Sequence, residues 1–151
     1  MDTSFRKILF CTDFSKGAAN AFRYALKAAR TNGAELHILH VMAEADAQFW
    51  NGYVVEDGQD LAEKNRKALI DKIQASYGSD IPQGIAWSAH MATGPAADKI
   101  AEFVRSNGIS LVVLGRPRPR FLRTFLFGSV AAKVARTVAC PLLVVPEQED
   151  A

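Results

Sequence analysis

We predict an α/β fold from the sequence, with a parallel β-sheet covered by helices on both faces. Short apolar segments alternate with longer segments whose apolar residues recur at helical spacing, which is typical of strand–helix–strand units. Three apolar segments, at 7–12, 110–115 and 141–146, are nearly continuous, as expected of strands buried on both sides. The chain has 151 residues without an evident repeat or linker, so we predict a single domain over residues 1–151.

The first half of the chain supplies two strands and two helices. The strand KILFCT ends at Asp13, and a helix follows in which Ser15 is the expected N-cap and Gly33 the expected end. A second strand, ELHILHVM, occupies residues 35–42. After a mixed segment, apolar residues at helical spacing predict a second helix over residues 59–77.

The second half continues the alternation. We predict strands at residues 84–92, 110–115 and 141–146, and helices at roughly 96–107 and 129–138. Right-handed crossovers restrict how these units connect. The resulting architecture is a five-stranded, doubly wound, Rossmann-like sheet of order 3-2-1-4-5.

Several classes of protein are disfavoured by composition. No apolar run approaches the roughly 18 residues that span a bilayer, and the N-terminus lacks the apolar stretch of a signal peptide. Cys11 and Cys140 are far apart and form no CxxC pattern, so we expect neither a disulfide framework nor a zinc site. We therefore expect a cytoplasmic protein.

Positive charge is concentrated near the end of the chain. Residues 107–146 hold six Lys or Arg and no acid, so the remainder of a chain of net charge +2 carries −4. Such asymmetry suggests contact with an anion on the basic side. The segment GRPRPRFLRTFLFGS could also be a nucleic-acid arm, a membrane-surface patch or a stiff solvated loop, but we expect neither nucleic acid nor membrane as its partner.

Four residues are expected to meet at one edge of the sheet. Open parallel sheets bind ligands beyond the carboxyl ends of their strands, where the strand order reverses. Asp13 ends the first strand and Gly115 ends the fourth, and these strands flank the predicted reversal. Gly128 and Ser129 begin the next helix, whose N-terminal amides favour an anion such as phosphate. Asp13 could instead serve only as a cap, and Gly-Ser is itself a common capping pair.

The sequence resembles the universal stress proteins over essentially its whole length. The resemblance is carried by KILFCTDFS, LHVM, TGPAADKI and VVLG, and by the closing block GSVAAKVARTVACPLLVVP. Nucleotide-binding members of that family carry the pattern G-x2-G-x9-G-[ST]. Here Gly115, Gly128 and Ser129 match the pattern, while Arg118 occupies the second glycine position.

The resemblance implies an adenine-nucleotide site. Asp13 would contact adenosine, backbone at Val41 would contact adenine, and Gly115, Gly128 and Ser129, with Val130 beside them, would hold phosphates. Val41 is nominated by the resemblance alone. Pro117 and Pro119 should make the RPRPR segment stiff and extended, so Arg118 either blocks the phosphate position or grips phosphate through its guanidinium.

Two functions remain open. The first is an ATP-binding sensor or regulator of the stress response, in which any Mg²⁺ arrives with the nucleotide and hydrolysis is at most slow. The second is a family member that does not bind nucleotide and acts through dimerisation and protein partners. The resemblance implies a homodimer through the last strand, Pro141 to Pro146, which would be an exposed sheet edge.

The histidines and Cys11 are expected to have structural roles. His37 and His40 are three apart on a strand and point to opposite faces, and His90 is alone in its strand, so we predict no metal site. Cys11 is expected to be a buried thiol. The acidic segment 43–58 is either solvated or a lid over the crevice.

Overall fold

The computed structural model describes residues 3–42, 58–116 and 129–147, with the side chains of residues 58–63 and 65 left aside. Within these ranges the chain alternates strands and helices, as the sequence predicts. The elements are β1 (Lys7–Cys11), α1 (Lys16–Asn32), β2 (Glu35–Met42), α3 (Gly58–Tyr77), the 3₁₀ turn η1 (Gly78–Asp80), β3 (Trp87–Thr93), α4 (Ala96–Asn107), β4 (Leu111–Arg116), α5 (Ser129–Thr137) and β5 (Leu142–Pro146).

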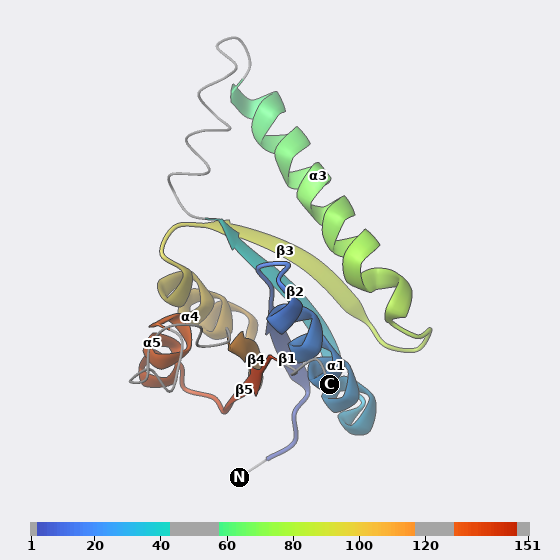
Figure 1. The fold of residues 1–151 in the computed structure, drawn as a ribbon, viewed down its shortest axis with the longest axis vertical. Helices are drawn as coiled ribbons and strands as arrows, with labels where there is room; N and C mark the ends of the chain where they lie inside the picture. The colour runs from blue at the N-terminus through green and yellow to red at the C-terminus, as the bar shows by residue number, and fades with distance from the viewer. Residues whose placement is uncertain (1–2, 43–57, 117–128, 148–151) are drawn as a thin grey trace.

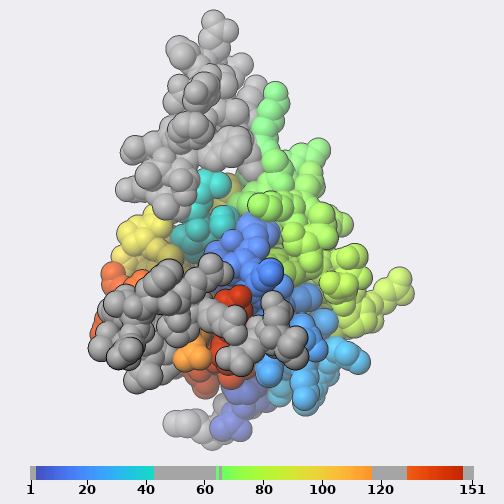
Figure 2. Space-filling view, in the orientation of Figure 1, coloured from blue at the N-terminus to red at the C-terminus, as the bar shows by residue number. Residues whose placement is uncertain are grey.

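The described strands form one parallel sheet of five, in the order β3-β2-β1-β4-β5. The predicted topology is therefore confirmed. Helices α1 and α3 lie on one side of the sheet, and α4 and α5 lie on the other (Figure 1). In the space-filling view the green surface of α3 adjoins the blue surface of the amino-terminal part of the chain (Figure 2). No helix in the described ranges is long and apolar enough to cross a membrane.

Strand β1 lies at the centre of the sheet because its side chains are apolar on both faces. Ile8, Leu9 and Phe10 are fully buried. Ile8 and Phe10 pack into the cluster beneath α1 and α3, whereas Leu9 packs into the cluster beneath α4 and α5. Each such side chain contributes roughly 1.5–3 kcal/mol through burial, so this strand anchors both layers.

Helix α1 has the ends that the sequence predicts. Ser15 is the N-cap, and its Oγ accepts a hydrogen bond from the Ala18 N–H at 3.1 Å. Gly33 ends the helix in the left-handed conformation at φ 58°, where a residue with a Cβ would be strained. The cap places the first turn of α1 directly after the end of β1.

Strand β3 begins three residues later than expected. We predicted a strand over residues 84–92, but Gly84 has φ 101° and the Ile85 N–H donates to the Pro82 carbonyl in a turn. This turn delays the strand to Trp87. Apolar Ile85 packs against the core from the turn, which explains why it reads as part of a strand.

Candidate functional site

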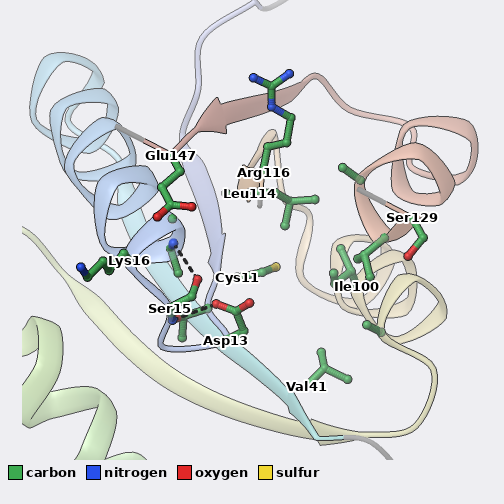
Figure 3. Close-up of a pocket in the computed structure, with 17 residues that line it drawn as sticks. Cys11, Asp13, Ser15, Lys16, Val41, Ile100, Leu114, Arg116, Ser129 and Glu147 are labelled. Atoms are coloured by element: carbon green, nitrogen blue, oxygen red, sulfur yellow. Dashed lines mark hydrogen bonds between the residues drawn. The ribbon is translucent and has the colours of Figure 1, made fainter. Parts of the chain in front are cut away.

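A pocket of about 420 Å³ lies beyond the carboxyl ends of β1 and β4, two neighbouring strands of the sheet (Figure 3). This is the position at which we predicted a ligand site, because the strand order reverses between β1 and β4 and the helices that follow them lie on opposite faces of the sheet. Its volume is within the range usual for small-molecule sites. It is lined by Cys11, Thr12, Asp13, Ser15, Lys16, Gly17, Ala18, Val41, Ala96, Ile100, Leu114, Gly115, Arg116, Ser129, Val130, Ala131 and Glu147.

Among the described residues, Asp13 is one of two acidic side chains that line this pocket, the other being Glu147 (Figure 3). Asp13 follows the end of β1, and its Oδ1 accepts a hydrogen bond from the Ser15 N–H at 2.9 Å. That bond fixes the carboxylate while the side chain remains exposed. A carboxylate accepts up to four hydrogen bonds, so Asp13 retains capacity for hydroxyl or amino groups of a ligand. The N-cap of α1 is Ser15 and not Asp13, so the Asp13 carboxylate stays available to a ligand.

The backbone after Asp13 adopts an unusual conformation. Phe14 has φ 63°, in the left-handed region that bulky residues rarely occupy. Its N–H donates to the Thr12 Oγ1 at 2.9 Å, and the Thr12 hydroxyl lies 2.6 Å from the hydroxyl of Tyr77 in α3. These bonds hold a tight bend in which Asp13 is the middle residue. Strain of this kind is often found beside binding sites.

The Phe14 ring is held by neighbours on the α3 side of the sheet. The Lys72 Nζ lies 4.3 Å from the ring centroid, in the geometry of a cation–π contact. The His40 ring lies 5.0 Å from it, and the Tyr77 ring is stacked at 6.3 Å. Burial raises the pKa of Tyr77, and the Asp13 charge adds to that rise, so Tyr77 is a neutral phenol near pH 7.

Gly115 is required by packing against helix α1. A Cβ at this position would lie 2.7 Å from the carbonyl oxygen of Gly17 and 3.0 Å from the Ala18 nitrogen. These are backbone atoms, which cannot move aside as a flexible side chain could. Gly115 therefore allows the first turn of α1 to sit against the end of β4, which brings that turn to the pocket wall.

Three helices present their N-termini to the pocket. Lys16 and Gly17 come from the first turn of α1, Ala96 begins α4, and Ser129 begins α5. Helix N-termini carry unpaired N–H groups and a partial positive charge. At α4 the cap residue Pro95 makes no side-chain cap bond. The wall formed by these N-termini therefore favours an anionic group.

Another part of the wall is apolar. Val41, Ile100 and Leu114 come from β2, α4 and β4, and Cys11 lies at the end of β1. Burial raises the pKa of the Cys11 thiol far above its usual range, so the thiol is neutral and serves as a small apolar wall. Such a wall suits a flat, weakly polar ring.

The structure brings together most of the predicted site residues. Asp13, Val41, Gly115, Ser129 and Val130 all line the pocket, and Val130 is 39% exposed. Arg118 and Gly128 lie outside the described residues, as does most of the 43–58 segment. Whether Arg118 blocks or completes the site stays a prediction.

Sequence reasoning missed other residues at the same pocket. Lys16, Gly17, Ala96 and Glu147 also line it. The sequence offers no signal for Gly17, because a Cβ there would meet nothing closer than 3.5 Å and glycine is not required at this position. Glu147 directly follows β5, and no spacing rule relates it to Asp13.

The geometry determines which ligand chemistry the pocket can accept. Asp13 can receive hydrogen bonds, the apolar wall can cover a ring, and the helix N-termini can hold an anion. These surfaces lie around one space of about 420 Å³. A ligand that uses all of them has a ring, hydroxyl or amino groups, and a negatively charged group.

The universal stress protein family model matches residues 4–146. Universal stress protein YxiE of Bacillus subtilis is 30% identical, over 93% of this chain and 99% of its own length. Universal stress protein MJ0531 of Methanocaldococcus jannaschii is 28% identical, over 96% of this chain and 85% of its own length.

Solved structures share the fold. Hypothetical protein MJ0577 superposes with a TM-score of 0.75 at 22% identity, covering 97% of this chain and 99% of that one. A universal stress protein in complex with cAMP gives 0.68 at 18% identity, covering 96% and 99%. An Arabidopsis thaliana family protein with AMP bound gives 0.58 at 17%, covering 96% and 94%. At these identities the structures establish the fold alone. With the family match over nearly the entire length, the chain belongs to the universal stress protein family.

Proposed function

We propose that this protein binds an adenine nucleotide, ATP in particular, in the pocket between β1 and β4, and acts as a nucleotide-dependent regulator of the stress response. The observation that carries the proposal is the convergence of Asp13, an apolar wall and three helix N-termini on one pocket. A nucleotide supplies a matching partner for each: ribose hydroxyls, the purine ring and phosphate.

The placement of each nucleotide part follows from the chemistry of the walls. The carboxylate of Asp13 accepts hydrogen bonds from ribose hydroxyls or from the adenine amino group. Val41 and Ile100 cover the base, and the amides beginning at Ser129 hold phosphate. Mg²⁺ accompanies ATP on its phosphate oxygens. Related folds that hold cAMP and AMP support an adenine ligand.

Isothermal titration calorimetry on the full chain tests this proposal. ATP, AMP and cAMP should be titrated with and without Mg²⁺, and protein from a gentle purification should be denatured and assayed for released nucleotide. We expect one adenine nucleotide per chain. The proposal would be refuted if the purified protein released no nucleotide and the titration gave no heat at millimolar ATP.

The alternative is a family member that acts through dimerisation without nucleotide. Strand β5 is at the described sheet edge, and its Leu143 is 38% exposed, which favours pairing with a second copy. Arg118→Gly and Arg118→Ala discriminate the two functions. If Arg118→Gly gains ATP binding that the parent lacks, the alternative holds. If the parent binds ATP and Arg118→Ala weakens it, arginine holds the phosphate.

A further inference from the structure

Two histidines that are 53 residues apart in the sequence are neighbours on the sheet. His37 lies in β2 and His90 in β3, and the parallel register places His37 opposite Ser88. All three side chains lie on the sheet face that α4 covers, where the Phe103 ring contacts both imidazoles edge-on. This cluster is separate from the nucleotide pocket, none of whose lining residues it shares.

Three polar atoms of this cluster form a small triangle. The His37 Nδ1 lies 3.1 Å from the His90 Nε2 and 3.2 Å from the Ser88 Oγ, and the Ser88 Oγ lies 2.8 Å from the His90 Nε2. Two neutral imidazole nitrogens and a hydroxyl thus converge on one point. Only a proton, shared in hydrogen bonds, or a cation can satisfy two facing nitrogen lone pairs.

The other nitrogen of His37 has an acidic neighbour. The His37 Nε2 is buried without a hydrogen-bond partner, and the Oε1 of Glu35 lies 3.6 Å from it. A proton on Nε2 is attracted by this carboxylate, which leaves Nδ1 with its lone pair directed at the triangle. Metal-binding histidines usually have such a carboxylate at the nitrogen that does not touch the metal, where it orients the ring.

We propose that His37 and His90 bind a divalent transition-metal ion such as Zn²⁺ or Cu²⁺. The ion sits at the triangle, on the His37 Nδ1 and the His90 Nε2, with Ser88 beside it. Imidazole suits these metals. Two nitrogens at about 2.0–2.1 Å from a tetrahedral ion are about 3.3 Å apart, close to the 3.1 Å observed. The ring centroids are 5.3 Å apart, so the imidazoles face each other and each must rotate to direct its lone pair at the ion.

Beyond the two imidazoles the described residues supply few ligands here, so a bound metal ion should exchange with solution. In the part of the chain that the structure covers, no three His, Cys, Asp or Glu side chains are arranged to hold a metal. The Ser88 hydroxyl and water therefore complete the coordination. Burial lowers the pKa of both histidines, which keeps them neutral, the form that binds metal. Lys7 and Arg66 lie near enough to oppose a cation, whereas Glu35 favours it.

Calorimetric titration of the chelator-stripped full chain with ZnCl₂, without nucleotide, tests the proposal. We expect one ion per chain and a loss of at least tenfold in affinity for His37→Gln and for His90→Gln. Glu35→Gln should lose roughly 10–100-fold. The matched control is His40→Gln, the third histidine of the chain, which lies on the opposite face of β2. It should bind as the parent does.

A spectroscopic measurement on the parent protein tests the site without relying on variants that could fail to fold. The electron paramagnetic resonance spectrum of the one-to-one Cu²⁺ complex should show coupling to two imidazole nitrogens, and circular dichroism should verify that each variant is folded. Any one of three results would overturn the proposal: the parent protein binds no Zn²⁺, the folded His37 and His90 variants bind it as tightly as the parent, or the copper spectrum lacks coupling to two imidazole nitrogens.

Discussion

The hydroxyl groups of Thr12 and Tyr77 lie 2.6 Å apart and connect the end of β1 to the last turn of α3. The Thr12 Oγ1 also accepts the N–H of Phe14, so this hydroxyl closes the bend that presents Asp13 to the pocket. Helix α3 therefore contributes to the geometry of the pocket, although none of its described side chains lines the pocket.

Tyr77→Phe should weaken both the fold and nucleotide binding. Removing one buried hydrogen bond costs about 1 kcal/mol of the free energy of unfolding, and a looser bend should lower the ATP affinity severalfold. Urea denaturation and calorimetry measure the two effects. Tyr24→Phe is the matched control, because Tyr24 is 50% exposed on α1 and its hydroxyl removal should change neither quantity. Equal effects in both variants would contradict the role of Tyr77.

Phe14 offers a test of backbone strain. At φ 63° glycine avoids the steric cost that any other L-residue bears. Phe14→Ala and Phe14→Gly both lose the aromatic contacts, so their difference isolates the backbone. We expect Phe14→Gly to be more stable than Phe14→Ala by about 1 kcal/mol in urea denaturation. The reverse order would show that Phe14 is unstrained in solution.

Gly115 and Gly17 form a matched pair for the packing of α1 on β4. Gly115→Ala forces a Cβ to within 2.7 Å of the Gly17 carbonyl oxygen, whereas a Cβ on Gly17 meets nothing closer than 3.5 Å. We expect Gly115→Ala to lose about 1–3 kcal/mol of stability. Gly17→Ala should be neutral or gain up to about 1 kcal/mol from helix propensity. Thermal and urea unfolding measure the stability of both variants. Equal losses of stability would contradict the close packing of Gly115 against α1.

The Cys11 thiol should resist alkylation in the native protein. Burial raises its pKa, so the reactive thiolate stays scarce even when the pH is raised from 7 to 9. We expect iodoacetamide, followed by mass spectrometry, to modify Cys11 far more slowly in native than in urea-unfolded protein. ATP should slow the native reaction further, because Cys11 lines the pocket. Rapid native labelling that ATP does not change would contradict this placement.

The sequence predicted what depends on local pattern and strand order. The buried strand β1, the Ser15 cap and the Gly33 terminus follow from neighbouring residues, and Asp13 and Gly115 meet because parallel strands end at one edge. The strain at Phe14 was not predictable, since it depends on Thr12 and Tyr77 meeting across the fold.

The histidine cluster could not be predicted from the sequence, because it depends on the register between two strands. Within its own strand His90 has no histidine neighbour, and only the pairing of β2 with β3 places it beside His37. The reason for Gly115 was hidden in the same way, because the close backbone atoms belong to α1. Both features depend on how separate elements dock, which periodicity within one element does not encode.

The location of nucleotide binding is the claim on which the functional account depends. Amide chemical-shift mapping by NMR, with ATP titrated into ¹⁵N-labelled full chain, tests it most directly. A basic patch on α1, formed by Arg23, Lys27 and Arg30 beside a second pocket, serves as the internal control for nonspecific phosphate binding. The account predicts saturable shifts at Asp13, Gly115 and Ser129. Shifts confined to the α1 patch, or none at millimolar ATP, would contradict it.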